Sequence, residues 1–122
     1  MLKAGLFSDF KGANTLLFWG DEQGLAELRA SIAALSSGRS STITVGEVSI
    51  AKKKGHARLS ELSHYRDRLF WACAPTVLAD AEGLLAGLDQ VPSGHHLIDI
   101  TGLADQVIVS KCEYPADLRP RH

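Results

Sequence analysis

Two adjacent histidines and an aspartate form the most suggestive polar cluster in the sequence. His95, His96 and Asp99 lie in an apolar segment of strand length, where His95 and Asp99 share one face and His96 points to the other. A metal site needs at least one further ligand, for which His64 and His56 are the available histidines. A His-x-His pair, the bidentate spacing on a strand, is absent. We therefore expect an exposed strand end that holds no metal and no other cofactor.

The two cysteines, Cys73 and Cys112, are candidate nucleophiles, because a thiolate beside a base or a positive charge can attack a substrate. His95 and His64 are the candidate bases. Neither cysteine stands at a predicted helix N-terminus, although Lys111 precedes Cys112. Their apolar neighbours favour buried free thiols over a disulfide or a reactive thiolate. The sequence therefore predicts no enzymatic activity.

A run of basic residues has the composition of a phosphate-binding segment. Lys52, Lys53, Lys54 and Arg58 stand at the expected tip of a β-hairpin, and such a tip can enter a groove or contact a single strand of nucleic acid. The alternative interpretation is a charged turn that protects a sheet edge from aggregation. A nucleic-acid-binding or regulatory module is thus one of two functions that the charges suggest.

The other function follows from the acidic residues. The net charge is −1, but residues 1–38 carry three basic and four acidic side chains, residues 39–68 seven and three, and residues 69–122 three and seven. Such asymmetry indicates a charged partner and has little bearing on the fold. We expect a protein partner to be bound by acidic side chains of the last part: Asp80, Glu82, Asp99, Asp105 and Glu113.

The length and composition predict one ordered domain over residues 1–122. Hydrophobic residues make up 45% of the 122 residues and charged residues 22%, which is ordinary for a globular chain. Polar residues from Ser8 onward interrupt the apolar start before it could serve as a signal peptide. No stretch approaches the roughly 20 apolar residues of a membrane span. We therefore expect a cytoplasmic protein that does not contact a membrane.

Apolar periodicity predicts the elements. A strand over 15–19 precedes Asp21, a good N-cap, and the helix that follows has apolar residues at 25, 28, 32 and 35. A second helix opens at Pro75 and has an acidic start at Asp80 and Glu82. The remaining patterns predict a bulged strand over 42–50, strands over 57–62 and 68–74, a loop over 64–67 and a loosely held tail over 115–122. The strands over 95–100 and 106–112 are expected to form a hairpin around Gly102.

A loose internal repeat relates two of these segments. Leu17-Phe18-Trp19 precedes an acidic helix start at Asp21, and Leu69-Phe70-Trp71 precedes, after an insertion, the acidic start at Asp80. Each copy predicts a strand followed by a helix, with the two tryptophans in equivalent core positions. We expect an α+β fold in which two helices pack on one face of a mostly antiparallel sheet, in a ferredoxin-like or related arrangement. A homodimer formed through a sheet edge is compatible with this fold.

The chain resembles the small immunity proteins found beside bacterial polymorphic toxins. The resemblance lies in the helix from Glu22-Gln23-Gly24-Leu25 to Leu35, a strand at Ile43, and the final segment from Asp105 to Tyr114. It implies a non-enzymatic protein that occludes a cognate toxin, with specificity held on exposed loops and charged faces. Our expectation is therefore a small protein-binding module, with nucleic-acid binding as the alternative.

Overall fold

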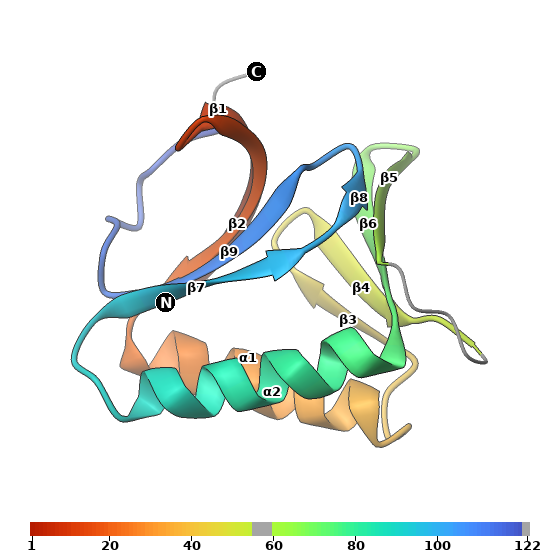
Figure 1. Ribbon diagram of the computed structural model, residues 1–122, viewed down its shortest axis with the longest axis horizontal. Coiled ribbons are helices and arrows are strands. Elements are labelled where there is room, and N and C mark those ends of the chain that lie inside the picture. Colours follow the sequence, from red (N-terminus) through yellow and green to blue (C-terminus); the bar gives the residue numbers. More distant parts are fainter. Residues whose placement is uncertain (55–59, 121–122) are drawn as a thin grey trace.

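The computed structural model describes residues 1–54 and 60–120 and has the α+β class that the sequence predicts (Figure 1). Neither helix of the described residues is long and apolar enough to cross a membrane. In chain order the elements are β1 (Leu2–Phe10), β2 (Ala13–Gly20), α1 (Glu22–Ser36), β3 (Thr42–Val45), β4 (Val48–Lys52), β5 (Glu61–Tyr65), β6 (Arg68–Cys73), α2 (Pro75–Asp89), β7 (Gly94–Asp99), β8 (Thr101–Gly102) and β9 (Gln106–Lys111).

The strands form two mixed sheets, with the orders β1-β2-β9-β7 and β3-β4-β6-β5-β8. In each sheet a parallel pair, β2 with β9 or β4 with β6, joins two antiparallel hairpins. Since β7 pairs with β9 while β8, two residues further on, pairs with β5, one segment passes from the first sheet to the second. The single sheet of a ferredoxin-like arrangement is therefore not formed.

The described elements form two similar halves, β1-β2-α1-β3-β4 and β5-β6-α2-β7-β9, with the short β8 as an additional strand between β7 and β9. Each half contributes one hairpin to each sheet. Residue 22 corresponds to residue 75 and residue 36 to residue 89, a shift of 53 at both ends of the helices. The same shift aligns the buried apolar side chains of the two helices: Leu25, Leu28, Ile32 and Leu35 correspond to Leu78, Ala81, Leu85 and Leu88.

The register of this repeat differs from the predicted one. α2 begins at Pro75 as predicted, but Asp80 therefore lies within the helix and is not its acidic start. Trp71 corresponds to Phe18, and their ring centroids are 5.8 Å apart in the main core. Trp19 lies on the other face of its sheet, in a separate apolar cluster. Because side chains alternate along a strand, the one-residue difference in register decides which face an aromatic ring occupies.

The main core lies between the helix pair and the two sheets, which rise from one side of the helices (Figure 1). A second cluster, formed by Phe7, Leu17, Trp19 and Ile108, covers the outer face of the first sheet. The segment after β9 packs on this cluster through Tyr114 and Leu118. Trp19 Nε1 also donates a hydrogen bond of 2.9 Å to Pro115 O. These contacts hold the described part of the predicted tail, residues 115–120, against the sheet.

The predicted basic hairpin is wrong. β6 lies between β4 and β5, parallel to the first and antiparallel to the second. The connection between β4 and β5 is therefore a crossover. Pairing with β6 places Val48 beside Leu69 and Ile50 beside Trp71, four side chains that are at most 4% exposed. This burial explains why β4 pairs with the distant strand. Arg58 lies outside the described residues.

Three other elements differ from the prediction. Residues 42–50 form a β-hairpin and not one bulged strand, because Gly46 (φ 57°) and Glu47 make a two-residue turn. β5 extends through His64 and Tyr65, which were predicted to be in a loop. β1 was not predicted at all, and it pairs along β2 with an irregularity between Phe7 and Phe10.

The first helix and the last hairpin are confirmed. Asp21 is the N-cap of α1, and its Oδ1 accepts a 2.8 Å hydrogen bond from Gly24 N and a 2.9 Å hydrogen bond from the Met1 amine. The hydrogen bond from Gly24 N is the main cause that lowers the pKa of Asp21, and the Met1 amine adds to it. β7 and β9 pair as the predicted antiparallel hairpin, from Gly94 opposite Lys111 to Asp99 opposite Gln106.

Candidate functional site

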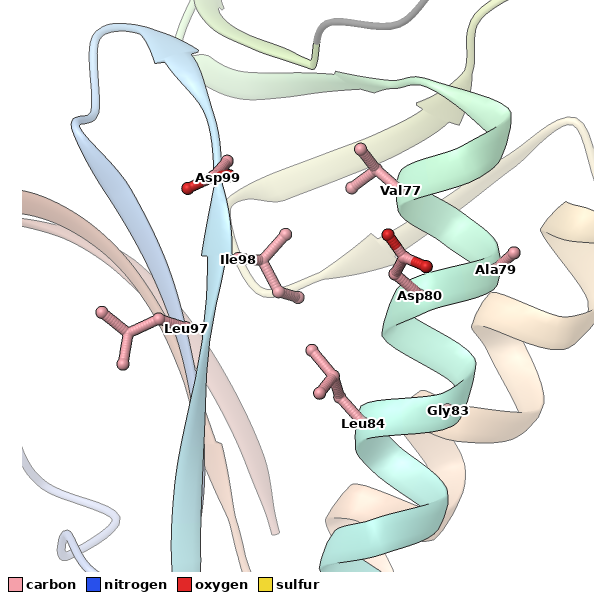
Figure 2. A pocket seen from close by; sticks show the side chains of 8 residues that line it. All are labelled: Val77, Ala79, Asp80, Gly83, Leu84, Leu97, Ile98 and Asp99. Atoms are coloured by element: carbon pink, nitrogen blue, oxygen red, sulfur yellow. The ribbon is translucent and has the colours of Figure 1, made fainter.

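A groove of about 490 Å³ lies between α2 and β7 (Figure 2). Val77, Asp80 and Leu84 project from the helix toward the strand, and Ile98 projects from the strand toward the helix. Asp99 stands beside Ile98 at the end of β7. The groove shares Val77, Asp80 and Asp99 with an adjoining hollow of about 280 Å³, whose other lining residues are Ser60, Thr76, Ile100 and Thr101.

Local sequence explains why these side chains line the groove. Positions 77, 80 and 84 follow one face of a helix, since residues three, four and seven apart lie above one another. α2 begins at Pro75, and its N-cap residue, Ala74, has no side chain that could cap the helix. Ser60 Oγ instead accepts a 3.0 Å hydrogen bond from the backbone N–H of Ala74. On β7 the alternation directs Ile98 inward, whereas Leu97 points to the outer face and is 57% exposed.

The groove carries two negative charges above an apolar floor. The residues that line it and the adjoining hollow include the carboxylates of Asp80 and Asp99 but no lysine, arginine or histidine. Both aspartates are exposed, and neither forms an ion pair with another described residue. Such a site favours a cationic group that also offers apolar surface.

The other predicted partner-binding residues lie elsewhere. Glu82 is a half-buried residue of α2 and does not line the groove. Asp105 joins the starts of β9 and β2, because its Oδ2 accepts a 3.0 Å hydrogen bond from Asn14 N and its own N–H donates a 2.8 Å bond to Asn14 O. Glu113 belongs to a cluster on the outer face of the first sheet. Of the five acidic residues, the structure brings only Asp80 and Asp99 into one groove.

The Glu113 cluster lacks the order of a hydrolytic triad. Ser110 Oγ donates a 2.5 Å hydrogen bond to Glu113, and His95 Nδ1 lies 3.0 Å from the same carboxylate. Burial raises the pKa of Glu113, but the hydrogen bonds from Ser110 and His95 outweigh this effect and hold the pKa below its ordinary value. In a triad the histidine stands between the hydroxyl and the acid. Here the acid stands between them, so His95 cannot take the Ser110 proton.

The remaining chemical candidates are also separated. Cys73 is fully buried, and burial raises the pKa of its thiol to about 11, which disfavours the nucleophilic thiolate. Cys112 is exposed. Among residues 1–54 and 60–120, no set of three or more histidine, cysteine, aspartate and glutamate side chains is arranged to hold a metal ion. His95 faces Glu113 and not Asp99.

The basic residues have a partly structural use. Lys52 Nζ donates a 3.0 Å hydrogen bond to Ser36 O at the end of α1. Lys111, at the equivalent place in β9, donates 2.9 Å bonds to Leu88 O and Val91 O at the end of α2. Lys54 is exposed and Lys53 half-buried beyond β4. Nucleic-acid binding by this segment stays a prediction.

Sequence reasoning did not identify the apolar floor of the groove, which is formed by Val77, Leu84 and Ile98. Val77 and Leu84 lie on one helical face with Asp80. In the sequence, the pattern that could have indicated the site is this apolar helical face interrupted by an acidic residue. This pattern indicates a groove only when β7 is known to lie beside α2. Comparisons with protein-family models, curated proteins and solved structures find no match for this chain.

Proposed function

We propose that this chain is a protein-binding module that uses the groove between α2 and β7, and that its partner is a toxin whose working surface it occludes. The observation that carries the proposal is that Asp80 and Asp99 both border an apolar groove whose lining includes no basic residue. The two aspartates come from different elements, and neither has an ion-pair partner among the described residues.

Physical chemistry indicates what such a surface binds. Exposed carboxylates steer a basic partner toward the groove, and further burial of the half-buried Val77 and Leu84 against the partner supplies the short-range attraction. The toxin as partner rests on the resemblance to immunity proteins. A blocking role needs a surface that matches the partner and requires no catalytic group.

The test is capture of the partner with charge-reversed variants. Tagged wild-type protein, the double variant Asp80→Lys/Asp99→Lys and the control Glu27→Lys are incubated with nuclease-treated lysate of the native cells, and the bound proteins are identified by mass spectrometry. Glu27 is the matched control because it is exposed and corresponds to Asp80 in the other half, at the same shift of 53.

We expect a stoichiometric basic protein that the wild type and Glu27→Lys capture and the double variant does not. Expression of that protein alone should arrest growth, and co-expression of the wild-type chain should restore it. Equal capture by all three variants would refute a role for the groove. A captured partner that is harmless when expressed alone would refute the toxin-blocking role.

A further inference from the structure

β7 is a sheet edge that remains open beside the groove. It stands at the end of the first sheet, and among the described residues it pairs with β9 alone, in continuous register from Gly94 to Asp99. In an antiparallel pair alternate residues direct their N–H and C=O groups away from the partner strand. β7 therefore offers a row of free backbone donors and acceptors next to the groove.

The other sheet ends are less open to an added strand. β8 has two residues and β3 has four. β1 pairs regularly with β2 from Leu2 to Phe7 but irregularly between Phe7 and Phe10, and Pro120 covers its face at Gly5, where an added Cβ would be 2.8 Å from the proline ring. Short length and irregular pairing are devices by which proteins protect edges. β7 combines six regularly paired residues with an adjacent groove.

We infer that the partner presents an extended basic segment, which adds to β7 as a further strand of the first sheet and lies in the groove against α2. This inference rests on the proposed function and deepens it by naming the kind of segment that the groove accepts. Strand addition of this kind takes affinity from backbone hydrogen bonds and specificity from alternate side chains.

The side chains around β7 determine the composition of that segment. Figure 2 shows Ile98 directed toward α2, where Val77 and Leu84 also point, whereas Leu97 and Asp99 project from the other side of the strand. A strand added here has one row of side chains over the apolar floor and the other row beside Leu97 and Asp99. Apolar residues suit the first row, and lysine or arginine suits the places near the two aspartates.

Charge argues against a second copy of this chain as the occupant. Two copies that joined through β7 would bring two acidic grooves together, and like charges at close range oppose association. The lining residues of the groove supply no cation to offset this repulsion. A basic segment of a different protein neutralises the same carboxylates.

The probe for strand addition is a short fluorescent peptide of alternating Lys and Val, blocked at both ends, whose binding to the full chain is measured by anisotropy at low salt. Two versions carry backbone N-methyl groups, one on every Val and the other on every Lys. In a strand, all Val N–H groups point to one edge and all Lys N–H groups to the other. The two methylation patterns therefore block opposite edges of the peptide and leave its charge unchanged.

Strand addition predicts that one methylated peptide loses at least about 10-fold in affinity, since each lost backbone bond weakens binding about 5-fold, and that the other keeps most of its affinity. Asp99→Lys should weaken binding of the unmodified peptide about 2- to 5-fold, and Glu27→Lys should not. Hydrogen exchange of alternate β7 amides should slow in the complex, while that of β1 amides should not change.

Equal affinity of the two methylated peptides, or no binding of the unmodified peptide to the wild-type chain, would overturn strand addition. The proposed function survives either result if capture of the toxin still depends on Asp80 and Asp99. If the peptide binds by edge-specific pairing but no toxin is captured through the groove, strand addition stands as a property of β7 and the proposed function fails.

Discussion

Replacement of Lys111 by Met tests how the end of α2 is held. Lys111 is only 3% exposed, and its ammonium donates 2.9 Å hydrogen bonds to Leu88 O and Val91 O. Leu88 O belongs to the last turn of α2, whose carbonyl groups have no partners further along the helix. The positive charge also complements the negative end of the helix dipole. Met keeps the length of the apolar stem and removes the donor.

The magnitude follows from two opposing effects. Loss of two charge-assisted hydrogen bonds costs about 1.5–3 kcal/mol each, but removal of a buried ammonium also relieves a desolvation penalty of several kcal/mol. Leu88 O keeps a 3.3 Å hydrogen bond from Val91 N, and Val91 is 41% exposed, so its backbone lies near water. We therefore expect Lys111→Met to lower the free energy of unfolding by about 1–3 kcal/mol.

Lys52→Met is the matched control, because Lys52 makes the equivalent hydrogen bond to Ser36 O from an exposed position. Water can replace its ammonium, so the expected loss is at most about 0.5 kcal/mol. Urea unfolding followed by tryptophan fluorescence measures both losses. If each substitution changes only the folded state, the slope of the unfolding free energy against urea concentration should stay unchanged. Equal losses in the two variants, or a more stable Lys111→Met protein, would refute this account of the buried lysine.

The remaining predictions concern glycines, thiols and acid stability. Gly24→Ala should lower the free energy of unfolding by about 1–3 kcal/mol, because the new Cβ would lie 1.7 Å from Met1 O. Gly83→Ala should raise the free energy of unfolding by about 0.5–1 kcal/mol, because no described atom lies within 4 Å of its new Cβ. Urea unfolding of both variants measures the two changes. Iodoacetamide should label the exposed Cys112 in the folded protein and Cys73 only after unfolding, because Cys73 is fully buried and the pKa of its thiol is raised to about 11. Peptide mass spectrometry identifies the labelled cysteines. The pKa of Glu113 is lowered on folding, so its contribution to stability is present above about pH 4.5 and is lost as the pH falls through the folded-state pKa. Urea unfolding at a series of pH values should therefore show the difference between wild type and Glu113→Gln shrinking in acid; a constant difference would contradict this assignment.

Local sequence patterns predicted the elements whose form depends on near neighbours. Asp21 followed by an apolar stripe was sufficient for α1, since capping and helical periodicity act within a few residues. The apolar segments around Ile98 and Ile108 likewise gave the β7–β9 hairpin, whose strands are close in sequence. The repeat was detectable because both halves use the same strand–helix pattern, but its register was wrong by one residue at Trp71.

Strand partners were not predictable in the same way. The alternation of a strand specifies which side chains face the core, yet several strands can satisfy that requirement equally well. The insertion of β6 between β4 and β5 depends on burial of Ile50 beside Trp71, a contact between residues far apart in the chain. The predicted basic hairpin was wrong for this reason.

The candidate site shows the same division. Residue types and spacing were sufficient to predict that Asp80 and Asp99 are charges in an acidic part of the chain and that a helix and a strand carry them. No strong catalytic motif accompanies them in the sequence. The packing of α2 beside β7, by which Asp80 and Asp99 line one groove, became visible in the three-dimensional fold, as did the hydrogen bonds that hold Asp105 and Glu113 elsewhere. The physical reason is that residue type and periodicity act locally, whereas burial of the shared core selects which distant elements become neighbours.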